Sequence, residues 1–90
     1  MSNITFPAKF EFLDEIRELV AQVARQGGFS EKAIYSLQLA ADEAASNIIE
    51  HAYEGVTNAK LDITCDMQGD ALVITMRDTG KPFDPSQVKQ

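Results

Sequence analysis

The stretch LAADEAASNIIEHAY, residues 39–53, forms the second half of a long predicted helix around which the fold is built. Ser30 is a good N-cap residue, and Glu31 lies in the first turn, where the helix dipole favours negative charge. The helix is expected to run from about Glu31 to about Tyr53 and to end at Gly55 and the three residues after it. Since each residue turns the helix by about 100°, one continuous arc is predicted to pack on a sheet: Ala44, Leu37, Ile48, Ala41, Ile34, Ala52 and Ala45.

Polar residues follow the margin of this arc. Glu43, Asn47 and His51 are spaced four residues apart and are expected to form a stripe there, together with Ser36 and Ala40. A carboxylate at such a margin would be partly shielded from water, which makes it a better base, and would still be open to a ligand. The amide oxygen of Asn47 is of the kind that Mg²⁺ prefers. Polar residues at helical spacing are also typical of a plain solvated face, so spacing alone leaves both interpretations open.

Solvent is expected on the opposite side of the helix, at Asp42, Ser46, Glu50, Tyr35 and Tyr53. Ahead of this helix, Ile4 to Ala8 is predicted to form a short strand closed by Pro7. Phe10 to Arg25 is predicted to form a second amphipathic helix, because apolar residues recur there at spacings of three and four. Gly27 and Gly28 are expected to end that helix.

A hairpin is predicted after the long helix. Its first strand alternates apolar and polar residues from Ala59 to Met67, and its second strand does so from Ala71 to Arg77, which is the period of a half-buried strand. Gln68-Gly69-Asp70 is the expected turn. The fold class is therefore α+β: a two-layer sandwich with two helices on one face of a small mixed or antiparallel sheet. Residues 79–90 are expected to form a loop.

Composition narrows the function classes. Ninety residues allow a single domain, predicted to span 1–90, and the net charge of −6 argues against a nucleic-acid or membrane partner. Cys65 is the only cysteine, so no intrachain disulfide can form, which fits a reducing cytoplasm. Neither a signal peptide nor a bilayer-spanning stretch is expected in the sequence, and a cytoplasmic protein is predicted.

Two motifs in order make the pattern more specific. Residues 39–53 resemble the N box of the anti-sigma-factor serine protein kinases, within the GHKL superfamily of ATPases. Asp78-Thr-Gly-Lys-Pro-Phe-Asp-Pro85, which follows the predicted hairpin, resembles the G1 box of that family. The opening Ile-Thr-Phe-Pro-Ala, followed by an amphipathic helix, also resembles the family's start. This resemblance covers nearly the whole chain and implies the first part of a Bergerat fold.

The resemblance implies a role for each matching residue. Glu43 matches the general base, and Asn47 matches the Mg²⁺ ligand. Asp78 matches the aspartate that accepts a hydrogen bond from the adenine amino group, and Gly80 the glycine that lets backbone approach the nucleotide. His51 is expected to serve in positioning or packing. The implied cofactors are ATP and Mg²⁺.

Other features leave alternatives open. Asp-Thr-Gly after a strand is also an ordinary turn signal, and Lys81 stands where the wider Asp-x-Gly-x-Gly pattern has its second glycine. Asp42 is expected to point to solvent.

The function implied by the resemblance is that of an ATP-dependent serine/threonine protein kinase and anti-sigma factor. It would bind a sigma factor and phosphorylate a serine of an anti-anti-sigma partner of the STAS type, and a homodimer is expected. The chain ends before the family's ATP lid and G2 box, so the domain is expected to be incomplete at its C-terminal side. A non-catalytic module that binds a nucleotide or a regulatory protein is the alternative, and an accidental likeness is the third interpretation.

Overall fold

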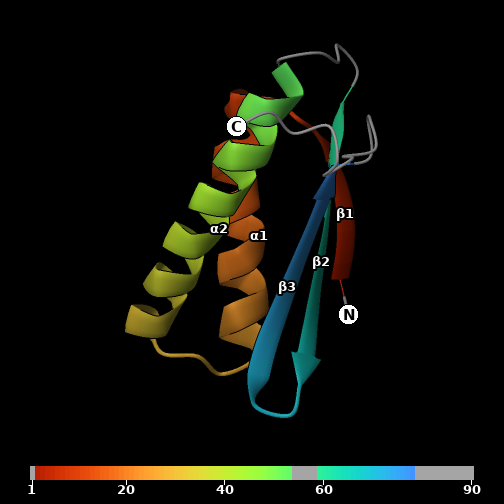
Figure 1. The fold of residues 1–90 in the computed structure, drawn as a ribbon. Coiled ribbons are helices and arrows are strands. Elements are labelled where there is room, and N and C mark those ends of the chain that lie inside the picture. The colour runs from red at the N-terminus through yellow and green to blue at the C-terminus, as the bar shows by residue number, and fades with distance from the viewer. Residues whose placement is uncertain (1, 54–58, 79–90) are drawn as a thin grey trace, which may run out of the picture.

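The computed structural model describes residues 2–53 and 59–78, which form two layers (Figure 1). Strand β1 (Ser2–Pro7) is followed by a 3₁₀ turn (Phe10–Phe12), helix α1 (Leu13–Gln26), helix α2 (Glu31–Tyr53), and strands β2 (Lys60–Gln68) and β3 (Ala71–Asp78). Both helices lie on the same side of the sheet. The predicted α+β sandwich is confirmed, with the first predicted helix beginning as a 3₁₀ turn and extending to Gln26.

The described strands form an antiparallel sheet in the order β1-β2-β3. Strand β2 is central, so its residue Leu61 pairs with Phe6 on one side and with Asp78 on the other. A two-residue turn joins β2 to β3, because Gln68 pairs with Ala71. Gly69 has φ 65°, a conformation that glycine adopts readily and that the first position of a type II′ hairpin turn requires.

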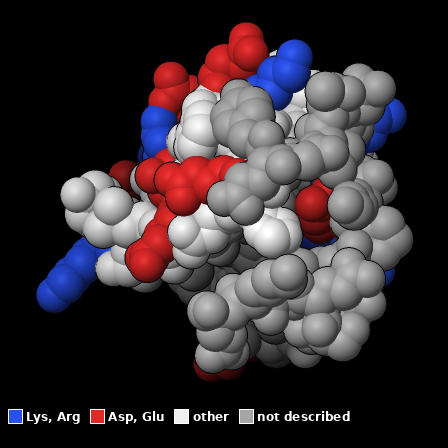
Figure 2. All heavy atoms as spheres, turned by 45° about the horizontal axis from the view of Figure 1, so that its top comes forward, with Lys and Arg blue, Asp and Glu red and all other residues white. Residues whose placement is uncertain are grey.

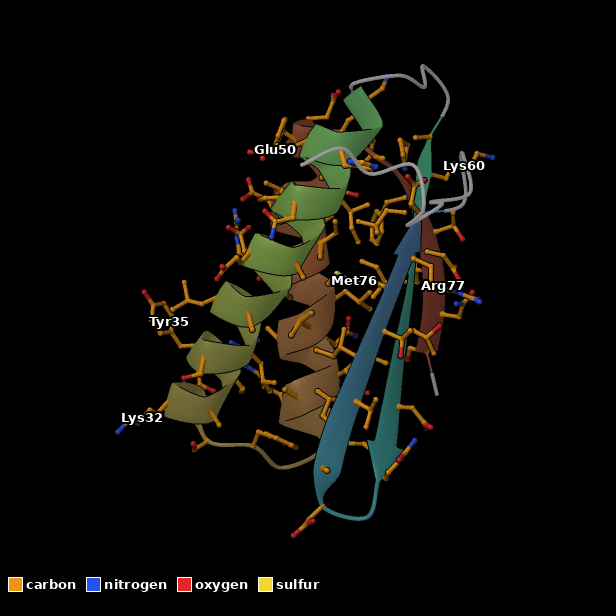
Figure 3. The ribbon with its side chains drawn as sticks, in the orientation of Figure 1. Lys32, Tyr35, Glu50, Lys60, Met76 and Arg77 are labelled. Atoms are coloured by element: carbon orange, nitrogen blue, oxygen red, sulfur yellow. The ribbon has the colours of Figure 1, made fainter. Side chains whose placement is uncertain are left out.

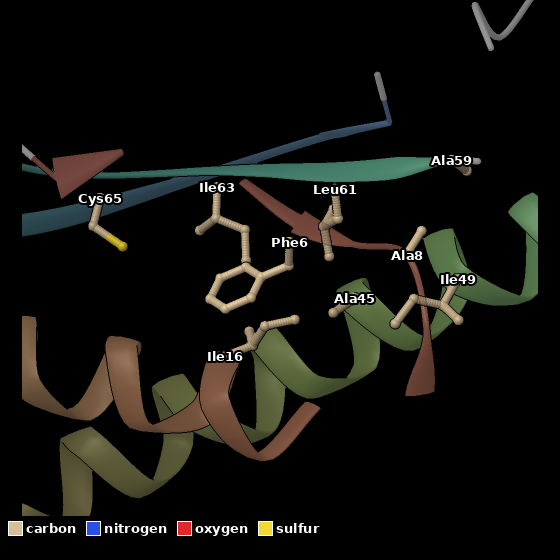
Figure 4. Packing of buried hydrophobic residues seen from close by; sticks show 9 residues of the cluster. All are labelled: Phe6, Ala8, Ile16, Ala45, Ile49, Ala59, Leu61, Ile63 and Cys65. Atoms are coloured by element: carbon tan, nitrogen blue, oxygen red, sulfur yellow. The ribbon is translucent and has the colours of Figure 1, made fainter. Parts of the chain in front are cut away.

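The core lies between the two layers (Figure 4). The apolar face of β2 is buried, as its alternation predicts, and the apolar residues of β3 are half-buried while their neighbours are exposed. Side chains from α1, from α2 and from the sheet with its flanking residues meet in one cluster. Its members are Phe6, Ala8, Ile16, Ala45, Ile49, Ala59, Leu61, Ile63 and Cys65. This cluster holds α1 and α2 against the sheet.

Helix α1 ends where its glycines predict. Gly28 has φ 83°, and its N–H donates to the carbonyl of Arg25 at 3.0 Å. The N–H of Phe29 donates to the carbonyl of Ala24, also at 3.0 Å. These two bonds form a Schellman motif, which satisfies the last carbonyls of the helix and turns the chain toward α2.

The buried face of α2 differs from the predicted arc. Its buried residues are Ile34, Ala41, Ala45 and Ile49, whereas Leu37 and Ile48 are half-buried and Ala44 is exposed. Tyr35 and Glu50 are exposed as predicted, but Asp42 and Ser46 are half-buried. The arc is rotated because α2 packs against α1 along one flank as well as against the sheet. The sequence of α2 alone does not show which flank the neighbouring helix covers.

Candidate functional site

The end of β3 lies beside the C-terminal half of α2. Asp78 is the last residue of β3 and pairs with Leu61. Leu61 packs in the same core cluster as Ala45 and Ile49 of α2. Met76, two residues before Asp78, lies between β3 and α2 (Figure 3). The fold therefore brings Asp78, the first residue of the predicted G1 box, to the same end of the molecule as the C-terminal half of α2.

Glu43 and Asn47 are both exposed, one turn apart on α2. Residues four apart on a helix differ by only about 40° in direction, so these two side chains share a face. His51 follows one turn later and is also exposed. The expectation that Glu43 is partly shielded at the margin of the buried arc is wrong for the described structure. Ala41 and Ala45, which are buried, lie about 160° away from Glu43 around the helix, on its opposite side.

Asp78 is the last residue of β3, as predicted, and it is half-buried there. Gly80 and the rest of the predicted G1 box lie outside the described residues. Among the residues described, no group of three or more His, Cys, Asp or Glu side chains could hold a metal ion by itself. A single amide oxygen such as that of Asn47 fits Mg²⁺ if phosphate oxygens and waters supply the other ligands, which is the usual arrangement for this ion.

An ion pair across the helices involves a residue that sequence reasoning missed. The guanidinium of Arg17 on α1 pairs with the carboxylates of Asp14 and Asp42. Asp42 was expected to point to solvent, but it is half-buried, because α1 covers that flank of α2. The side chain of Gln38 donates to the carbonyl of Arg17 at 3.0 Å. The helical spacing of Gln38 and Asp42 was visible in the sequence, but the partner on α1 was not.

Acidic groups dominate the exposed helix surface. Figure 2 shows Asp and Glu side chains grouped on the helix side of the molecule, where Glu15, Glu18, Glu43 and Glu50 are exposed. This agrees with the net charge of −6. No helix among the described residues is both long and apolar enough to cross a membrane.

Comparison with known proteins decides the family. The sequence profile of the histidine kinase-like ATPase domain matches residues 6–90. The chain belongs to this family. Its residues 39–53 and 78–85 therefore lie within a matched domain, and an accidental likeness of the two motifs is excluded.

Serine-protein kinases named RsbW are among the relatives of this ATPase domain. The protein of Oceanobacillus iheyensis is 33% identical over 95 residues, covering 100% of this chain and 60% of the relative. The protein of Listeria innocua is 31% identical over 98% of this chain and 56% of its own length. The protein of Bacillus cereus is 36% identical over 97% of this chain and 54% of its own length. The chain thus spans little more than half the length of these relatives.

Proposed function

We propose that this ATPase domain is part of an ATP-binding anti-sigma-factor serine/threonine protein kinase, which binds a sigma factor and phosphorylates a serine of an anti-anti-sigma partner of the STAS type. One observation carries the proposal: helix α2 with Glu43 and Asn47 lies beside the end of β3 at Asp78, within a domain matched over residues 6–90. The relatives named serine-protein kinase support the phosphoryl-transfer reaction.

Each candidate residue has one task in this proposal. Glu43 accepts the proton of the attacking serine hydroxyl, and its exposure leaves it accessible to a protein substrate. Asn47 offers its amide oxygen to Mg²⁺. Asp78 accepts a hydrogen bond from the adenine amino group, and Gly80 allows close approach of backbone to the nucleotide. His51, one turn beyond Asn47, helps to position this end of α2. ATP supplies the phosphoryl group and Mg²⁺ offsets the charge of its phosphates.

A non-catalytic nucleotide- or protein-binding module is the second candidate function. It is favoured by one observation: among the described residues, Glu43 and Asn47 stand on an open helix face. Phosphoryl transfer depends on groups fixed around the phosphates. If the complete protein binds ATP without transferring phosphate, this second function holds.

The proposed setting is the cytoplasm, with protein partners only. The acidic helix surface suits basic protein surfaces and disfavours nucleic acid and anionic membranes. A homodimer is also proposed, since β1 has a neighbouring strand on one side only within the described sheet.

Two substitutions in the full-length protein separate binding from chemistry. Asp78→Asn is expected to raise the Kd for ATP about tenfold or more, because a neutral amide oxygen accepts a weaker hydrogen bond from the adenine amino group than a carboxylate does, and the amide NH2 can face that group instead. Glu43→Ala is expected to keep ATP binding and to lower kcat by about 10²- to 10⁴-fold, the usual contribution of a general base. Calorimetric titration with ATP and Mg²⁺ measures the first effect, and phosphorylation of a STAS-type partner measures the second.

Glu50→Ala is the matched control, because Glu50 is an exposed carboxylate two turns beyond Glu43 on nearly the same face of α2 and has no task in this proposal. It is expected to change neither quantity. Absence of ATP and ADP binding to the full-length protein would refute the ATP-dependent function. Undiminished phosphoryl transfer by Glu43→Ala would refute the assignment of the base.

A further inference from the structure

The interface between α1 and α2 combines small and large apolar side chains. At one end Ala21 and Ala24 of α1 pack with Ile34 of α2. At the other end Ile16 of α1 packs in the cluster that contains Ala45 and Ile49 of α2. Alanine gives a shallow ridge, and apolar contact has no direction of its own. These apolar contacts hold the helices together, and directional polar contacts can add to what fixes their relative axial position.

A polar bridge stands between these two apolar ends. Arg17 is anchored on its own helix by Asp14 and reaches across to Asp42 of α2. Gln38, one turn before Asp42, donates to the backbone carbonyl of Arg17 at 3.0 Å. Hydrogen bonds and paired charges have defined geometry. The side chains of Arg17 and Asp42 are 36% and 34% exposed, so the pair lies at the margin of the apolar interface, where it can contribute to the register of the two helices. The Arg17–Asp42 ion pair and the Gln38–Arg17 hydrogen bond both join α2 to the same residue of α1. Together they therefore specify the axial position of α2 relative to α1.

We propose that Asp42 is a positioning residue for the phosphoryl-transfer reaction: with Gln38, its pairing to Arg17 sets the axial register of α2 and thereby the place of Glu43 and Asn47 relative to the sheet. The inference rests on the proposed kinase function. Glu43 directly follows Asp42 in the chain, and a slip by one residue moves a helix by about 1.5 Å along its axis. A displacement of about 1 Å at reacting groups can cost about a hundredfold in rate.

The test compares kcat and KM for ATP in variants of the full-length protein. Asp42→Ala is expected to lower kcat about tenfold or more with little change in KM, since adenine recognition at Asp78 is retained. Arg17→Ala is expected to have the same effect, and the double variant is expected to be no worse than either single one. Asp42→Glu, which keeps the charge, is expected to stay near the wild-type kcat. Glu50→Ala is the control without effect.

Wild-type kcat in Asp42→Ala would overturn the proposal, and so would additive losses in the double variant, because Asp42 would then not act through Arg17. Hydrogen exchange of the backbone amides of residues 38–49, measured without ATP, gives a readout that does not need phosphoryl transfer. Asp42→Ala is expected to accelerate this exchange, and Glu50→Ala is not. If the wild-type protein transfers no phosphate, the proposed function fails. In that case the hydrogen exchange still tests the role of Asp42 in setting the register of α2. Unchanged exchange in Asp42→Ala would overturn that role, and accelerated exchange would support it.

Discussion

Neighbouring residues of α2 have different surroundings, and this decides what each can do. Glu43 is exposed and has no part in the packing, whereas Asp42, one position earlier, is half-buried and paired with Arg17. The two carboxylates differ by about 100° around the helix. Asp42 therefore faces α1, and Glu43 is exposed on another face of the helix. The two adjacent carboxylates differ in their surroundings because α1 covers one flank of α2.

Cys65 is buried in the central strand, and desolvation raises the pKa of its thiol above the ordinary value of 9.0. The thiolate is the reactive form, so alkylation of the folded protein at mildly alkaline pH is expected to be at least about tenfold slower than that of the protein unfolded in urea. Rates of iodoacetamide labelling followed by mass spectrometry check this. Equal rates in the two states would show that β2 is not protected.

The same shift has a defined effect on stability. Because the folded pKa lies above the unfolded value, the stability that Cys65 contributes is fully present below 9.0 and is lost as the pH rises through the folded pKa. Cys65→Ser is expected to remove the part of the decrease in folding stability at alkaline pH that comes from ionisation of this thiol.

At the scale of elements, local sequence signals determine where α2 begins, and packing against its neighbours determines how the rest of the helix is oriented. The N–H of Ala33 donates to the hydroxyl of Ser30 at 3.2 Å, so the predicted N-cap is confirmed. The Schellman motif at Gly28 directs the chain from α1 into this cap. The two helices thus lie side by side after a short connection, which permits the Arg17–Asp42 pair.

Ser30→Ala is expected to lower the free energy of unfolding by about 1 kcal/mol, since the Ala33 N–H loses its side-chain partner. Ser36→Ala is the matched control, because Ser36 is an exposed serine inside the same helix, where alanine is the better helix former. That control is expected to be neutral or slightly stabilising. Urea unfolding monitored by circular dichroism measures both variants, and equal losses would contradict the capping role.

At the scale of the whole molecule, β1 is an edge strand of the sheet that the described residues form, and this edge is a candidate surface for assembly. Ile4, Phe6 and Leu19 line a shallow groove between β1 and α1, with the carboxylates of Glu15 and Glu18 at its rim. An unpaired strand edge beside apolar surface is a common site of strand addition. Pairing of two β1 strands would extend the antiparallel sheet across both copies of the proposed homodimer.

Ile4→Glu in the full-length protein is expected to weaken this dimer, since it adds a further negative charge to an acidic, partly apolar groove. Val73→Glu is the matched control: Val73 is 40% exposed against 41% for Ile4, but it lies on β3 at the other edge of the described sheet. Sedimentation at several protein concentrations distinguishes the species. Equal dimer dissociation constants in the two variants would show that the interface does not include Ile4 on β1. A wild-type protein that stays monomeric at all concentrations would exclude the dimer.

Local patterns predicted most of the fold. The alternation in β2 and β3, the glycines after α1 and the cap at Ser30 each depend on neighbouring residues in the chain, and the structure confirms them. The motif positions on α2 and at the end of β3 were also predicted, and the roles of Glu43, Asn47, His51, Asp78 and Gly80 stay predictions. The buried face of α2 was predicted less well, because the helix wheel treats one helix without its neighbours.

The sequence by itself determined which elements form and in what order, because helix periodicity, strand alternation and turn glycines are local properties of the chain. Membership of the histidine kinase-like ATPase domain is likewise carried by the sequence. Only the tertiary structure decided that Ile49 is buried, that Glu43 is exposed and that Asp42 pairs with Arg17. These outcomes depend on where α1 lies against α2, and residues 25 positions apart meet only after both helices pack on the sheet.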